Sequence, residues 1–155
     1  MRRCLLFIVA VTLLVHGWGQ DKKQNPFGID VSHHNGIICW EKVPDVEFVY
    51  IKATEGATYV DPMCQRNIKG ARAKKFRVGA YHYFRTTSSV QKQFENYKKH
   101  VKKNDIDLIP MVDVEECRKW STVQFQDSLM RFIQLVKSYY GKAPMIYSVN
   151  TLKVR

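Results

Sequence analysis

The sequence predicts an α/β protein built on a parallel sheet, and two observations lead to this fold class. Five short apolar runs with few polar interruptions have the composition of strands buried on both faces. They are residues 27–32, 48–54, 77–84, 108–115 and 144–149. Between several of these runs, apolar residues recur at helical spacing. Strands that alternate with helices favour right-handed parallel crossovers, and both an open doubly wound sheet and a barrel satisfy this pattern.

Three of the intervening segments carry an apolar stripe that predicts a helix. The third also has a capping box at Ser121 and Gln124 and a stop signal at Gly141. No G-x-G-x-x-G loop follows a strand, so nothing favours a dinucleotide-binding sheet. The stripes are Cys64, Ile68 and Ala71; Val90, Phe94, Tyr97 and Val101; and Phe125, Leu129, Phe132, Ile133, Val136 and Tyr140.

The amino terminus predicts an export signal over residues 1–19. Arg2 and Arg3 precede a continuous apolar run, and small residues follow it at Gly17 and Gly19. A retained membrane anchor is the competing interpretation, but a membrane-spanning helix needs about 20 apolar residues and this run is shorter. We therefore expect a secreted or periplasmic protein, with a short polar lead over residues 20–26 and one folded domain over residues 27–155.

The composition indicates a basic protein, with a formal net charge of +11. A basic exported protein is suited to bind anionic surfaces such as bacterial walls. Nucleic acid is the competing partner, but no nucleic-acid-binding motif surrounds the lysines.

Removal of the signal leaves Cys39, Cys64 and Cys117, and three thiols cannot all pair within one chain. Their spacing does not suggest a zinc site.

Two carboxylates, Asp113 and Glu115, end the fourth predicted strand. Residues i and i+2 of a strand point to the same face, and the carboxyl ends of parallel strands carry the active sites of barrels and open sheets alike. Crowding of the two acids would raise the pKa of at least one, which glycoside hydrolysis requires of its acid catalyst. Taken alone, the triplet also fits two solvated acids or a divalent metal site.

Further candidates follow the other strands. Asp30 ends the first strand and supplies a third carboxylate, although it could instead cap the following turn. His33 and His34 come next, and adjacent loop histidines are expected to diverge, which disfavours a metal site. Aromatic rings suitable for stacking on sugars occur at Tyr81 and Tyr147, near the ends of two other strands.

Together, five segments resemble the family 25 glycoside hydrolases, the Chalaropsis-type lysozymes. They are GIDVSHHNG (28–36), FVYIKATEGATYVDP (48–62), VGAYHYF (78–84), PMVDVEE (110–116) and PMIYSVN (144–150), in the order found in the family. The resemblance implies an irregular TIM-like β/α barrel that cleaves the β-1,4 bond between N-acetylmuramic acid and N-acetylglucosamine in peptidoglycan. It also implies a protein without cofactor or catalytic metal, and we expect a monomer that binds neither nucleic acid nor, after signal removal, the membrane.

The resemblance also assigns roles. Glu115 matches the general acid. Asp113 matches the neighbouring carboxylate, either as nucleophile or as helper of the substrate N-acetyl group, and Asp30 matches the first-strand acid. The substrate-binding positions, which line or brace the sugar groove, are Glu55, Tyr81, His82 and Tyr147.

The chain departs from the family pattern because only about five of the barrel strands are visible. We therefore expect an incomplete barrel that lacks its C-terminal part. An active muramidase is the first hypothesis, and a truncated, inactive wall-binding relative is the alternative.

Overall fold

The structure is a computed structural model of the chain, and it describes residues 26–115 and 122–148. The predicted signal over residues 1–19 and most of the polar lead lie outside the described residues. Ser121 of the predicted capping box and Cys117 also lie outside them. Cys39 is exposed, Cys64 is buried, and neither forms a disulfide in the structure.

Five parallel strands form the sheet, and they lie side by side in the order of the sequence. A short sixth strand, β3, pairs in the antiparallel direction with the end of β2. The strands are β1 (Gly28–Val31), β2 (Phe48–Glu55), β3 (Tyr59–Val60), β4 (Arg77–Tyr83), β5 (Met111–Val114) and β6 (Met145–Ser148).

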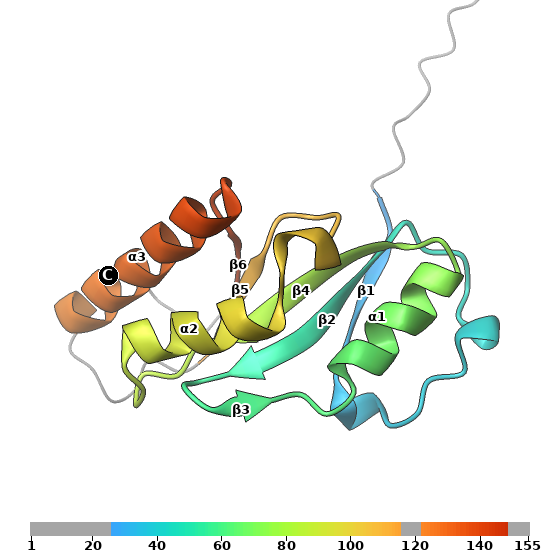
Figure 1. Cartoon of the computed structure of the whole chain (residues 1–155), viewed down its shortest axis with the longest axis horizontal. Helices are drawn as coiled ribbons and strands as arrows, with labels where there is room; N and C mark the ends of the chain where they lie inside the picture. Colours follow the sequence, from blue (N-terminus) through green and yellow to red (C-terminus); the bar gives the residue numbers. More distant parts are fainter. Residues whose placement is uncertain (1–25, 116–121, 149–155) are drawn as a thin grey trace, which may run out of the picture.

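The three α-helices of the described residues lie on one face of this sheet (Figure 1). They are α1 (Cys64–Ala73), α2 (Val90–His100) and α3 (Thr122–Tyr140), and single 3-10 turns occur at His33–Asn35, Trp40–Lys42 and Lys103–Asp105. A doubly wound sheet would carry helices on both faces. The sequential strand order and the one-sided helices instead form part of a β/α barrel, so the predicted incomplete TIM-like barrel is confirmed.

The fourth strand is shorter than the sequence predicts. The expected strand covered residues 108–115, but β5 begins at Met111. The backbone N–H groups of Asp107 and Leu108 both donate to the carbonyl of Val78, and Pro110 has no N–H to donate. A regular ladder therefore cannot form before Met111.

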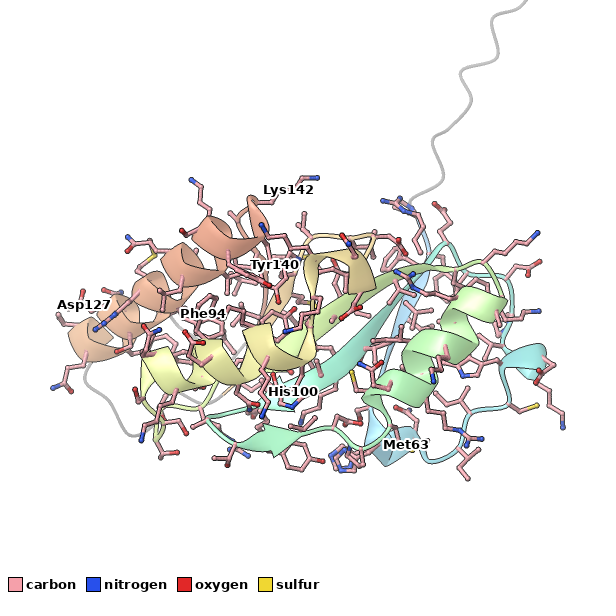
Figure 2. The ribbon with its side chains drawn as sticks, viewed as in Figure 1. Met63, Phe94, His100, Asp127, Tyr140 and Lys142 are labelled. Carbon is pink, nitrogen blue, oxygen red and sulfur yellow. The ribbon has the colours of Figure 1, made fainter. Side chains whose placement is uncertain are left out.

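The core lies between the sheet and the helices. One cluster joins β2 and β4 to α1, with Val49, Ile51 and Val78 fully buried. A second cluster joins β5 and Phe84, the residue just after β4, to α2 and α3. Phe94 of α2 and Tyr140 of α3 lie in the space between those two helices (Figure 2). With the exception of Ile133, the residues of the predicted helical stripes belong to these two clusters or pack against them.

At β6 the sheet has an exposed edge among the described strands. Met145, Ile146 and Tyr147 are all classed with the exposed large apolar residues, at 39–51% exposure. Within the described ranges, no helix has both the length and the apolar character needed to cross a membrane.

Candidate active site

A cavity of about 430 Å³ opens on the face of the sheet that the helices leave uncovered. Its walls come from alternate residues of the strands, because successive side chains of a strand point to opposite faces. The alternation is clearest in β2, where Phe48, Tyr50 and Lys52 line the cavity while Val49 and Ile51 enter the core.

The floor of the cavity depends on two glycines. A methyl group on Gly28 would lie 2.2 Å from the Phe48 ring, and one on Gly79 would lie 2.3 Å from the Tyr50 ring. Neither distance is compatible with a side chain there. Glycine thus lets the two rings lie flat across β1 and β4, and the Tyr50 hydroxyl then donates to the carbonyl of Ile109.

The structure brings all three predicted catalytic carboxylates into this cavity. Asp30 comes from β1, Asp113 from β5, and Glu115 from the residue just after β5. Glu115 is exposed and accepts a hydrogen bond of 3.4 Å from the Tyr83 hydroxyl. Asp113 is buried, and its Oδ1 has no hydrogen-bond partner within the described part of the chain. One acid of the pair is therefore accessible and the other is enclosed.

The enclosed acid, Asp113, has a raised pKa. Burial raises the pKa of Asp113 to about 7, and the negative charges of Glu115, Asp30 and Glu55 act in the same direction. The Lys52 ammonium opposes them and lowers the pKa. The sequence predicted a raised pKa within the pair, and the structure assigns it to Asp113.

Lys52 is a buried cation in the cavity wall that the sequence analysis did not single out. Its Nζ donates to Glu55 at 2.5 Å and lies 5.0 Å from the centre of the Tyr83 ring. Glu55 itself does not line the cavity but binds both Lys52 and Arg85. Hydrogen bonds from these two cations lower the pKa of Glu55 against the opposing effect of burial, which is the largest single influence. Glu55 thus braces the site through Lys52.

The two predicted aromatic residues, Tyr81 and Tyr147, both line the cavity, but they differ in exposure. Tyr81 is buried, and burial together with the charges of Asp30 and Asp113 raises its pKa, so it remains a neutral hydroxyl. Tyr147 is exposed on the edge strand β6 and pairs in register with Asp113. Tyr147 is accordingly the ring with the most surface open to a ligand.

His82 does not line the cavity, because it lies on the opposite face of β4. It is fully buried and stacks on Phe132 of α3 at 4.9 Å between ring centres. Its Nδ1 contacts the Thr54 hydroxyl at 2.8 Å, and its Nε2 contacts Gln93 at 3.2 Å. Burial lowers its pKa to about 4, against the raising effect of Gln93. The alternation of the strand explains this placement, and from there His82 can only brace the groove.

The two adjacent histidines also differ from expectation, because their rings pack against each other at 3.8 Å rather than diverge. His33 is held by Asp61, whose Oδ2 lies 2.8 Å from Nδ1. His34 lines the cavity beside Asp30. Within residues 26–115 and 122–148, no three His, Cys, Asp or Glu side chains are grouped so as to hold a metal ion.

Similarity to known proteins agrees with this geometry. The sequence profile of "Glycosyl hydrolases family 25" matches residues 29–153. The chain belongs to this family. It is similar to a family 25 glycosyl hydrolase from Bacillus anthracis, with a TM-score of 0.75 and 30% identity over 82% of this chain and 62% of that one. It is also similar to a muramidase from Trichobolus zukalii, with a TM-score of 0.72 and 30% identity over 79% and 64% of the two chains.

Curated relatives include the Escherichia coli (strain K12) protein YegX, 34% identical over 78% of this chain and 47% of its own length. An autolytic lysozyme of Clostridium acetobutylicum is 31% identical over 68% of this chain and 33% of its own length. The chain thus spans about half the length of YegX and about a third of the autolytic lysozyme.

Proposed function

We propose that this family 25 chain acts as a muramidase, which hydrolyses the β-1,4 bond between N-acetylmuramic acid and N-acetylglucosamine in peptidoglycan. The observation that carries the proposal is the cavity that Asp30, Asp113 and Glu115 line together with several tyrosine rings. Paired carboxylates are what glycoside hydrolysis requires, and aromatic rings present flat apolar faces to sugars. The similarity to muramidases and lysozymes supports the same reaction.

In this mechanism Glu115 donates a proton to the leaving glycosidic oxygen, since it is the accessible member of the pair. Asp113, which lines the same cavity, stabilises the positive charge that develops on the sugar, either as nucleophile or through the substrate N-acetyl group. With a pKa raised to about 7, Asp113 is partly protonated near neutral pH. The reaction requires a protonated Glu115 and a charged Asp113, and the Lys52 ammonium favours the charged form of Asp113.

The proposal includes export by the predicted signal over residues 1–19 and a monomer acting on the bacterial wall. The net charge of +11 favours approach to an anionic surface. Wall binding without hydrolysis is the second candidate. The exposed edge strand favours it, because the Tyr147 ring offers a surface for glycan contact and takes no part in the proton transfer.

The test is Glu115→Gln, assayed by lysis of purified peptidoglycan and by sedimentation with it. The amide cannot donate a proton, so lysis falls about 10²- to 10⁴-fold while binding persists. Glu47→Gln, which alters an exposed acid outside the cavity, is the matched control and keeps full lysis. N-acetylmuramic acid at the new reducing ends of the products identifies the bond.

Lysis by Glu115→Gln at the parental rate would remove Glu115 from the mechanism. Binding without lysis by the parent chain would favour the second candidate.

A further inference from the structure

A second hollow lies at the start of α2 and shares no lining residue with the sugar cavity. It measures about 540 Å³ and lies between the segment that links β4 to α2 and one side of α3. Of its eight lining residues, all except Val90 carry polar side chains: Thr86, Thr87, Ser88, Ser89, Gln91, Ser128 and Arg131.

Thr86 is the unusual residue of this hollow. It is 1% exposed, and its buried Oγ1 has no hydrogen-bond partner within the described ranges. A buried hydroxyl without a partner destabilises the protein, and native structures contain few of them. Because Thr86 lines the hollow, a ligand there can supply the partner that the described chain does not.

The beginning of α2 adds donors to the same hollow. The first N–H groups of any helix lack partners within it and carry partial positive charge. In α2 the Ser89 side chain forms no capping hydrogen bond, and the first turn contains no acidic residue. Val90 and Gln91 of this turn line the hollow. The helix terminus is therefore open to an external anion.

The linking segment is held in shape by Gln93, which is fully buried. Its Oε1 accepts from the backbone N–H of Arg85 at 2.8 Å. Its Nε2 donates to the carbonyls of Arg85 and Ser88 at 2.9 and 3.0 Å. These bonds fix the hollow before any ligand arrives, which reduces the ordering cost of binding.

We propose that this hollow binds a phosphate group. Arg131 supplies the positive charge, the Thr86 hydroxyl donates a hydrogen bond, and the free N–H groups of α2 complete the anion site. The single acidic residue in α3 is Asp127, shown in Figure 2, and it does not line the hollow. Free phosphate and the phosphodiesters of an anionic wall polymer present the same chemistry. The site is independent of hydrolysis in the other cavity.

The first experiment titrates the ¹⁵N-labelled full chain with inorganic phosphate. Saturable shifts of the Val90 and Gln91 amides are expected, and Arg131→Gln weakens binding about fivefold or more because it removes a charge-assisted contact. Lys137→Gln is the matched control. It removes the same charge from the last turn of the same helix, outside the hollow, and changes affinity less than about twofold.

Thr86→Val provides a second readout that does not depend on Arg131. Valine has nearly the same shape and no hydroxyl. Without phosphate the variant should be more stable than the parent in thermal unfolding, because the unpaired buried group is gone. Addition of phosphate should raise the unfolding temperature of the variant by less than it raises that of the parent. A less stable variant, or one with an equal gain, would overturn the role of Thr86.

Repeating the titration with poly(glycerol phosphate) separates the two sources of phosphate. Shifts at the same amides with the polymer show that the site accepts a chain-borne phosphodiester, and shifts with inorganic phosphate alone show that it takes the free ion. Absence of saturable shifts with both would mean that the hollow holds only solvent, and the proposal would be wrong.

Discussion

The part of the sheet formed by β1, β2 and β4 differs from the part that ends in β6. In β2 and β4, the residues that face the helices, such as Ile51 and Val78, have no exposure at all. In β6, Ile146 occupies the equivalent face and remains 41% exposed. The reason is coverage: α1 and α2 pack on β2 and β4, whereas β6 lies at the border of the described sheet.

The candidate site crosses this border. Lys52 belongs to the covered part, Asp113 lies on the strand between, Tyr147 belongs to the exposed strand β6, and Asp30 is exposed on β1 at the opposite edge. The buried charged groups Lys52 and Asp113 are therefore held by packed strands, while the aromatic ring most open to a sugar lies on the exposed strand β6. Three predictions test this difference, from the largest expected effect to the smallest.

The largest expected effect on the free energy of unfolding comes from truncating an isoleucine in each of the two parts of the sheet. Ile51→Ala empties a fully buried position and should lower the free energy of unfolding by about 2–5 kcal/mol. Ile146→Ala, the matched variant on β6, should lower it by less than about 1 kcal/mol, because its side chain is already partly solvated. Urea unfolding of both variants gives the comparison. Equal losses would show that β6 is as well supported as β2.

The second effect concerns pH and the strand between the two parts. The pKa of Asp113 is about 7 in the folded protein against an ordinary value of 3.8, so between these values the folded state binds more protons than the unfolded one. Its contribution to stability is complete below pH 3.8 and is lost as the pH rises through 7. Between pH 4 and 8, the parent should lose on the order of 1–3 kcal/mol relative to Asp113→Asn. Parallel stability curves for the two proteins would contradict the burial of Asp113.

The smallest effect concerns a contact that joins the two parts. The Tyr140 hydroxyl of α3 donates to the carbonyl of Val101, just after α2, at 2.7 Å. Tyr140→Phe should cost about 0.5–1.5 kcal/mol in urea unfolding, since it leaves that carbonyl unpaired. Tyr139→Phe, which alters the adjacent ring of α3, should cost less, because no hydrogen bond of the Tyr139 hydroxyl occurs within the described residues. A larger loss for Tyr139→Phe would show that the bond does not tie the parts together.

Much of the fold could be predicted from the sequence because its signals are local. Apolar runs and helical stripes placed all five parallel strands and all three described α-helices. The antiparallel β3 was missed, because Tyr59 and Val60 are too few residues to show any periodicity. The choice between a doubly wound sheet and a barrel also depended on the family resemblance, since both arrangements require the same alternation of elements.

Part of the candidate site was also predictable from the sequence. Asp30, Asp113 and Glu115 were found because each ends an apolar strand, and strand ends of a parallel sheet meet at one edge. Lys52 was missed because a lone lysine inside an apolar strand gives no local signal of its partner, Glu55, or of the neighbouring Asp113.

By itself, the sequence determined the order and type of the elements and the strands that carry the acids. Hydrophobic periodicity and chain order are local properties that can be read from neighbouring residues. The tertiary structure alone decided which acid is buried, which face of β4 carries His82, and that the apolar residues of β6 remain exposed. These properties depend on what packs against each side chain from distant parts of the chain: the pKa of Asp113 is raised by burial together with charges from β1 and from β2, and His82 is enclosed by α2 and α3.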